Sequence, residues 1–307
     1  MFKKMNNIFQ ARYTDPLITP KGRLKVGVFN TNVGKPLENA QVDIFAIDQN
    51  GDQKQIEGVI TDGSGQTLDV LLETPSKEYS FNPESEVRPY SLYNIRVSAS
   101  DFKSVNIENV EIFEDTTAIQ NVSLDLAESS ESTPQNIVIQ DNVLWGDFPP
   151  KIPEDEVKDL PPPTGFVVLD EPVVPEFIVV HDGSPNSNAP NYYVPFKDYI
   201  KNVASSEIYS TWNASTIRAN VLAIISFTLN RVFTEWYRGQ GKNFTITSST
   251  AFDQAFSYGR NIFEEISIIV DEVFSTYITR TNIAQPLLTQ YCDGRSSSCP
   301  NWMYQSQ

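Results

Sequence analysis

The chain has 307 residues, a hydrophobic fraction of 40% and a formal net charge of −16. This length predicts two domains of ordinary size, and the negative charge argues against a nucleic-acid partner and against binding to an anionic membrane surface. No segment reaches the roughly 18 uninterrupted apolar residues of a membrane span, and residues 1–21 hold no apolar run of signal-peptide length. We therefore expect no membrane span and no standard export signal.

Residues 22–126, which follow a tail of residues 1–21, are predicted to form short strands. The segments between the strands are rich in Gly, Asn and Asp, which favour turns. Apolar stretches of strand length fall at 22–29, 40–47, 67–73, 93–100, 105–113 and 120–126. Short strands at this spacing predict an antiparallel β-sandwich, and we expect it to fold as an independent unit.

Residues 127–170 change in composition and are rich in proline and acidic residues. Proline removes a backbone donor and favours extended backbone. This composition predicts a stiff, exposed linker, and exposed linkers are where proteases cut. Within it, NIVIQDNVLW at 136–145 is expected to dock on a neighbouring element as one short strand.

Residues 171–307 are predicted to form a second domain of α+β type, so the whole chain is expected to be α+β and multidomain. The stretch PEFIVVHDG at 175–183 has the pattern of a strand. Apolar residues recur at helical spacing in 215–241 and in 261–278, which predicts two helices with broad core-facing stripes. The sequence contains no Gly-rich phosphate-binding motif, no HExxH motif and no internal repeat.

Glu207 in YIKNVASSEIYSTW is the only acidic residue between Asp198 and Glu235. It has two interpretations. A solvated carboxylate at the start of a helix is common, because the helix dipole favours negative charge there. A buried carboxyl group with a raised pKa would instead be suited to general acid catalysis. The residues around Glu207 leave both interpretations open.

Cys292 and Cys299 are the only cysteines, and His181 is the only histidine. The cysteines could form a disulfide, remain as free thiols or supply two ligands to a metal. A structural zinc site needs four ligands, and only His181 and Asp293 could complete one here. We expect structural cysteines, no metal and no cofactor, and we place His181 at the surface or in a turn.

A family resemblance adds to these patterns. VPFKDYIKNVASSEIYSTWNASTIRANVLAIISFTLNR, residues 194–231, resembles the core of the stage II sporulation protein D domain, in which a Ser-Glu pair precedes a helix that begins after a tryptophan. SSTAFDQAFSYGR, IVDEVFSTYIT and QYCDGRSSSCPNWMYQ resemble later segments of that domain in the same order. With a preceding sandwich of the carboxypeptidase-regulatory type and a cleavable linker, the layout is similar to that of spore cortex-lytic enzymes of the SleC type.

This resemblance implies an enzyme made as a zymogen and located in the spore. Its activity would be lytic transglycosylation of cortex peptidoglycan, with Glu207 as the single acid/base and with no cofactor. The implied partners are glycan strands and an activating protease. The implied substrate-binding residues are Tyr209, Trp212, Arg218, Asn220 and Gln254. The implied processing region, next to VVLDEPVVP, comprises Thr164, Gly165, Val168 and Leu169.

Four positions depart from the family pattern. The usual arginine of the family helix falls near Ile225, Arg218 and Asn220 stand at its usual lysine and glutamine positions, and Tyr304 stands where the last motif has a serine. The family pattern continues beyond that motif, so we expect residues 171–307 to be a version of the domain shortened at its C-terminus. The alternative function is that of a non-catalytic structural or wall-binding spore protein that uses the same fold.

Overall fold

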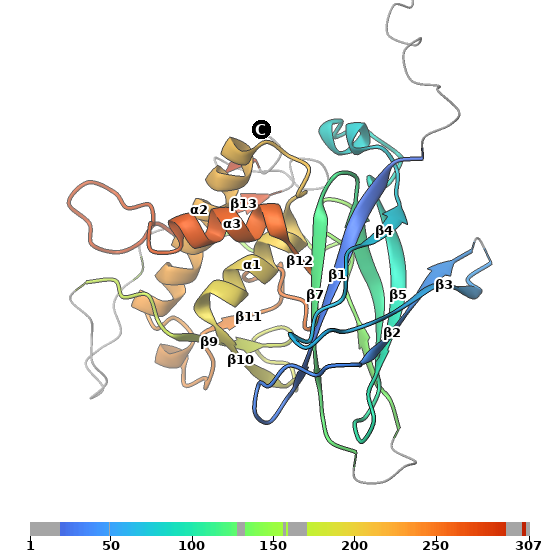
Figure 1. Ribbon diagram of the computed structural model, residues 1–307. Coiled ribbons are helices and arrows are strands. Elements are labelled where there is room, and N and C mark those ends of the chain that lie inside the picture. The colour runs from blue at the N-terminus through green and yellow to red at the C-terminus, as the bar shows by residue number, and fades with distance from the viewer. Residues whose placement is uncertain are drawn as a thin grey trace, which may run out of the picture.

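The computed structural model describes residues 19–48, 50–127, 133–155, 158, 171–292 and 303–304, with the side chains of Cys292 and Tyr304 left aside. The architecture is mixed α+β, with several sheets and few helices. Figure 1 shows a half made mainly of strands beside a half that contains the helices. Within the part of the chain described, no helix combines the length and the apolar character needed to cross a membrane.

The strand half contains a short 3-10 helix, η1 (Lys77–Phe81), and eight strands. They are β1 (Lys21–Asn30), β2 (Gln41–Ile47), β3 (Gln53–Ile60), β4 (Val70–Glu73), β5 (Tyr90–Ser98), β6 (Val105–Phe113), β7 (Thr117–Leu124) and β8 (Gln135–Val138). The helical half contains β9 (Phe177–His181), β10 (Asn191–Pro195), α1 (Phe196–Glu207), α2 (Ala214–Phe233), η2 (Arg238–Gln240), β11 (Ile246–Thr247), β12 (Ile262–Phe263), α3 (Glu264–Val273), β13 (Tyr291–Cys292) and β14 (Met303–Tyr304).

The strand half is built from two sheets, in the orders β12-β7-β1-β4 and β3-β2-β5-β6-β8. Both sheets contribute alternate apolar side chains to one core, as the buried Leu24, Val42 and Ile107 illustrate. The expected sandwich is not purely antiparallel, because β7 runs parallel to β1 and β8 runs parallel to β6. After β6 the chain crosses from one sheet to the other, and β7 then runs in the same direction as β1.

Strand β3 is missing from the sequence-based prediction. Nearly every one of its residues is exposed, and it pairs only with β2 at the edge of its sheet. A strand with water on both faces has no apolar alternation, so the pattern used to find strands does not detect it. The other strands of residues 22–126 fall within or next to the predicted stretches.

The helical half packs its three helices against one another, with α1 also against a small sheet of order β10-β9-β11 and α3 against β7. The two predicted helices are present but shorter, as Ala214–Phe233 and Glu264–Val273. Helix α1 was not predicted as a helix. It buries Tyr199, Ile200 and Val203 on its inner face.

The two halves share one hydrophobic core. Strand β12 of the helical half pairs with β7 and so completes a sheet of the strand half (Figure 1). Beside it, Arg260 Nη1 lies 3.0 Å from Glu111 Oε2, and both side chains are fully buried. Independent folding of residues 22–126 stays a prediction, and it would have to proceed without this strand and this ion pair.

The expectation of an exposed linker holds only in part for residues 133–155, because 133–136 are exposed and several later residues are buried. Residues 135–138 form β8, as expected for a docked strand, and Ile139 and Asn142 are fully buried. Apolar side chains in this segment have core surface to bury, which outweighs the preference of its prolines for extended exposed chain. The expected processing residues, Thr164, Gly165, Val168 and Leu169, lie outside the described residues.

Candidate functional site

Glu207 is the last residue of α1 and is only 2% exposed. The interpretation as a solvated carboxylate at a helix start is therefore wrong on both counts. The C-terminal end of a helix carries a partial negative charge, so neither the helix dipole nor solvent favours a carboxylate here. A charge placed against both preferences points to a role other than helix stability.

Both oxygens of the Glu207 carboxyl group accept hydrogen bonds. The Ala255 amide donates to Oε1 over 2.7 Å, and the Tyr291 hydroxyl donates to Oε2 over 2.6 Å. Burial raises the pKa of Glu207 above its ordinary value. The positive charge of Lys151 and these two hydrogen bonds oppose that rise without cancelling it. The site therefore holds a desolvated carboxyl group that takes up a proton more readily than one in water.

Gln254 supports this site from behind. Its Nε2 lies 3.0 Å from the Tyr291 hydroxyl, and its Oε1 accepts a hydrogen bond from the Tyr199 hydroxyl over 3.1 Å. All three side chains are buried. Gln254 was expected to bind substrate, whereas its contacts hold the tyrosine that binds Glu207.

Lys151 enters the same region from the segment that was expected to be linker. Its ammonium group contacts the carbonyl oxygen of Asp253 and lies 4.9 Å from the ring centre of Phe227 and 5.1 Å from that of Tyr291. Burial lowers the pKa of Lys151, while attraction to Glu207 and Asp253 opposes that change. Sequence analysis missed Lys151, whose one local signal is a lone cation between prolines.

A second buried cluster lies next to the site and is internally satisfied. Arg231 Nε donates to Asp253 Oδ1 over 2.7 Å, and its two terminal nitrogens donate to the carboxylate of Glu154 over 2.9 and 2.7 Å. Tyr237 and Thr247 donate to the other oxygen of Asp253. Both oxygens of the Asp253 carboxylate therefore accept hydrogen bonds from inside the fold.

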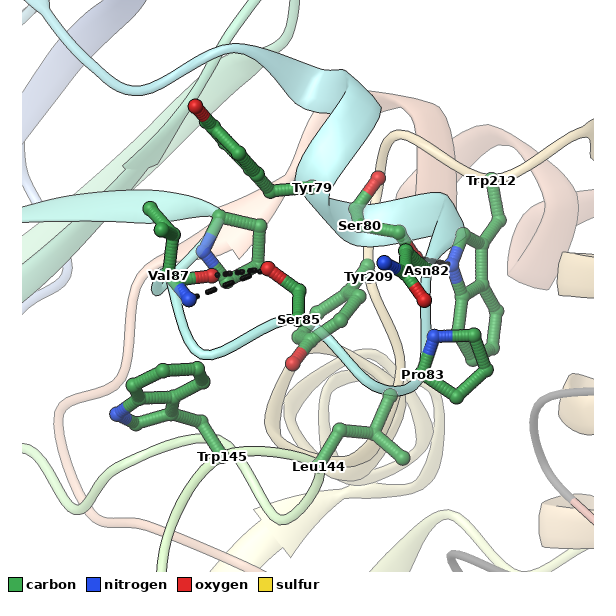
Figure 2. A pocket seen from close by; sticks show the side chains of 11 residues that line it. Tyr79, Ser80, Asn82, Pro83, Ser85, Val87, Leu144, Trp145, Tyr209 and Trp212 are labelled. Carbon is green, nitrogen blue, oxygen red and sulfur yellow. Dashed lines mark hydrogen bonds between the residues drawn. The ribbon is translucent and has the colours of Figure 1, made fainter. Parts of the chain in front are cut away.

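Tyr209 and Trp212 follow Glu207 but face another way. Both line a pocket between the helical half and the loop after η1, and Glu207 is not among the lining residues. Figure 2 shows Tyr209 near its centre, with Trp145 and Trp212 on opposite sides. The Trp212 indole donates to the carbonyl of Ser80 over 2.9 Å. The full lining is Tyr79, Ser80, Asn82, Pro83, Ser85, Val87, Pro89, Leu144, Trp145, Tyr209 and Trp212.

The structure places the other two expected substrate residues on α2. Arg218 is exposed and forms an ion pair with Glu272 of α3. Asn220 is buried, and its amide donates to the carbonyl of Thr216 one turn earlier, over 3.0 Å. Both residues therefore belong to α2, but the side chain of Arg218 is exposed and that of Asn220 is buried.

His181 was expected at the surface or in a turn and is instead buried at the end of β9. Its ring stacks on Phe244 with centres 4.6 Å apart, and Nδ1 lies 2.8 Å from Asn191 Oδ1. These contacts explain the histidine as a packed residue of the core.

Potential metal ligands do not gather anywhere in the described part of the chain. No three or more His, Cys, Asp or Glu side chains there form a group that could hold a metal ion. The role expected for the cysteines rests on the side chain of Cys292 and on Cys299, which lie outside the described residues.

No protein-family model matches the chain, and no curated protein matches it. Solved structures with some similarity include catechol 1,2-dioxygenase from Acinetobacter radioresistens, at 14% identity and a TM-score of 0.25 over 38% of this chain and 58% of that one. The Bacillus anthracis TIE protein is 11% identical, with a TM-score of 0.23 over 35% of this chain and 17% of that one. An (S)-allantoin synthase is 15% identical, with a TM-score of 0.24 over 34% of this chain and 41% of that one. The chain thus spans less than two thirds of the dioxygenase, and similarities this weak carry no argument about its fold or activity.

Proposed function

We propose that this chain is a lytic transglycosylase of spore-cortex peptidoglycan, and that residues 171–307 have the fold of the stage II sporulation protein D domain. The observation that supports the activity best is Glu207, the residue that matches the family's catalytic acid. Glu207 is buried at 2% exposure, and burial raises its pKa. A general acid must still carry its proton near neutral pH, and desolvation of a carboxyl group has that effect.

In the proposed reaction one carboxyl group acts twice. Protonated Glu207 donates its proton to the glycosidic oxygen between N-acetylmuramic acid and N-acetylglucosamine as that bond breaks. The resulting carboxylate then takes the proton of the muramyl 6-hydroxyl, whose oxygen closes a 1,6-anhydro ring. No water is consumed, so the second carboxylate of ordinary glycoside hydrolysis is not required. Among the described residues, the nearby Asp253 is held by Arg231.

We propose that the rim of the aromatic pocket contacts the saccharide. Tyr209 is only 7% exposed and packs on Phe113, so the partly buried Trp145 and Trp212 would offer the ring surface, and Asn82 and Ser85 would supply polar groups for hydroxyls (Figure 2). These residues come from both halves of the molecule. Glycan binding would therefore involve the strand half as well as the helical half.

Closure of Glu207 fits a zymogen. A carboxyl group at 2% exposure has no room for a sugar beside it. We propose that cutting between Thr164 and Leu169 opens the site, because Asn142 and Val143, which donate hydrogen bonds to the carbonyls of Ile208 and Ser206 on either side of Glu207, precede this region in the sequence.

The direct test uses purified cortex sacculi. Uncut protein, protein cut within 164–169 and cut Glu207→Gln protein are each incubated with sacculi, and mass spectrometry measures anhydromuropeptides. We expect product from the cut wild type alone. Equal product from cut wild type and cut Glu207→Gln would show that Glu207 is not the acid.

A non-catalytic wall-binding protein is the second candidate. The observation that favours it is the same closure, because a carboxyl group with both oxygens bonded inside the fold is also what a structural residue requires. Sacculus binding by every form of the protein, with anhydromuropeptides from none, would select this function.

A further inference from the structure

A polar hollow opens on the outer face of the five-stranded sheet β3-β2-β5-β6-β8. Val42 and Ile44 of β2 are fully buried in the sandwich core, so Asp43 and Phe45, which alternate with them, face outward. The hollow has a volume of about 110 Å³, and all of its lining residues belong to the strand half. Strands β2 and β3, which form part of it, lie on the side of that half away from the helices (Figure 1). Its polar and aromatic lining comprises Phe45, Gln53, Asn94, Arg96, Asn106 and Glu108.

A β-bulge between β5 and β6 fixes Asn94 beside this hollow. The register of the two strands shifts between Tyr93 and Ile95, so Asn94 lies opposite an extra residue of β6. Asn109 in β6 has a φ of 66°, and its amide donates to Asn94 Oδ1 over 3.1 Å. The oxygen of the Asn94 side chain is thus used inside the sheet, and the orientation of its amide group is set.

The other end of the same amide group has no partner. Asn94 is only 6% exposed, and among the hydrogen bonds of the described residues none uses its Nδ2 as donor. A buried donor without an acceptor is unfavourable, because it has lost its bonds to water. Since Asn94 lines the hollow, a group bound there can supply the missing acceptor.

Arg96 and Glu108 bring further free groups to the hollow. Arg96 Nε donates to Asn106 Oδ1 over 3.0 Å, and its guanidinium carbon lies 5.9 Å from the ring centre of Phe45. These contacts orient the guanidinium group, whose terminal nitrogens make no hydrogen bond or ion pair within the described part of the chain. Glu108 adds a carboxylate that can accept hydrogen bonds. The hollow therefore presents donors and acceptors side by side, next to one aromatic ring.

This combination points to one class of ligand. A sugar hydroxyl both donates and accepts, so a lining of amide, guanidinium and carboxylate groups can satisfy it. The ring of Phe45 offers apolar surface to the face of a sugar ring. An anionic ligand would instead meet Glu108 and also Asp43, which lies opposite Arg96 in the register of β2 and β5. The net charge of −16 disfavours a nucleic acid as well.

We propose that the hollow is a binding site for a neutral saccharide, whose hydroxyls bond to Asn94 and Arg96 and whose ring lies against Phe45. The site is separate from Glu207 and from the aromatic pocket of Figure 2, because it shares no lining residue with that pocket. It does not rest on the proposed function. The strand half holds a saccharide here whether or not the helical half cuts one.

NMR titration of the wild-type protein tests the site directly. The probes are triacetylchitotriose and maltotriose, two neutral trisaccharides with and without acetamido groups. We expect the side-chain amide resonances of Asn94 and the Nε–H resonance of Arg96 to shift saturably with at least one probe, and the tighter probe identifies the kind of sugar unit. The indole resonance of Trp212 reports on the aromatic pocket in the same spectra. No shift at Asn94 and Arg96 with either probe overturns the proposal, whatever Trp212 shows.

Asn94→Asp tests the free donor, because aspartate keeps the oxygen that accepts from Asn109 and loses Nδ2. The matched control is Asn121→Asp, which makes the same change at an exposed position of β7 in the other sheet. We expect several-fold weaker binding of the tighter trisaccharide by Asn94→Asp and unchanged binding by Asn121→Asp.

Arg96→Met is a second variant that leaves the bulge untouched and introduces no buried charge, since Arg96 is exposed. We expect it to weaken binding several-fold as well. Each variant is first compared with wild type by urea unfolding, so that only folded protein enters the titration. Wild-type affinity in both folded variants overturns the assignment of the hollow as the binding site. Wild-type affinity in Arg96→Met overturns it also where Asn94→Asp does not fold.

Discussion

The hydroxyl of Tyr291 donates a hydrogen bond to Glu207 Oε2 over 2.6 Å, between residues 84 positions apart in the sequence. Both groups are buried, so the bond is made in a medium of low dielectric constant, where a charged acceptor gains most. It ties the end of α1 to the start of β13. The bond also opposes the rise in the pKa of Glu207 that burial causes.

Tyr291→Phe removes this bond and leaves the ring in place. We expect the pKa of Glu207 to rise, because the ionised form loses a donor, and the unfolding free energy to fall by about 1.5–3 kcal/mol. NMR titration and urea unfolding measure the two effects. Tyr199→Phe is the matched control, since it removes a buried hydroxyl that contacts Gln254 but not Glu207. Equal shifts of the Glu207 pKa in both variants would contradict the prediction.

Glu207 makes stability depend on pH in a defined direction. Its pKa in the folded state lies above the ordinary value of 4.5, so the folded state binds the proton more tightly than the unfolded state. This contribution to stability is full below pH 4.5 and is lost as the pH rises through the folded-state pKa. Glu207→Gln does not titrate. We expect the variant to gain in unfolding free energy relative to wild type as the pH rises above 4.5, measured by urea unfolding across that range. Curves that stay parallel would show that the folded-state pKa is not raised.

The buried pair of Glu111 and Arg260 predicts a large loss of stability when one partner is removed. Arg260→Met leaves an unpaired carboxylate inside the junction of the two halves, where such a charge costs about 3–5 kcal/mol. Burial raises the pKa of Glu111 and Arg260 lowers it, so the variant also raises that pKa. The control is Glu111→Gln/Arg260→Met, which removes both charges and should recover part of the loss in urea unfolding. A double variant less stable than Arg260→Met would argue against an unpaired charge as the cause.

Arg218 offers a test of one residue implied by the resemblance. Its ion pair with Glu272 is exposed, and such pairs contribute about 0–1 kcal/mol. We expect the unfolding free energy of Arg218→Ala to lie within about 1 kcal/mol of that of wild type. We also expect the variant to bind cortex sacculi as wild type does, because the guanidinium lies on the surface and is held by Glu272. Glu272→Ala breaks the same pair and keeps the arginine. Weaker sacculus binding by Arg218→Ala, with normal binding by Glu272→Ala, would restore Arg218 as a substrate contact.

The parts of the fold that the sequence alone predicted are those in which apolar residues recur with the period of a strand or a helix. Alternation of apolar residues in Val105–Phe113 and helical spacing in Ala214–Phe233 are short-range patterns, so they identify elements without knowledge of their neighbours. The same approach missed β3, whose residues face water, and α1, whose small and polar residues are buried by other segments.

The candidate acid was visible in the sequence as a lone carboxylate, but its surroundings were not. Nothing in the residues next to Glu207 indicates Tyr291 or Lys151. Tyr291 reaches it from β13, and Lys151 reaches it from a segment whose composition predicted an exposed linker. Composition sets what a segment prefers when it is alone, whereas burial depends on the surface that the rest of the chain offers it. The sequence by itself therefore singled out Glu207 as the candidate acid, and only the tertiary structure decided how this carboxyl group is buried, which groups hold it and which charge opposes its protonation.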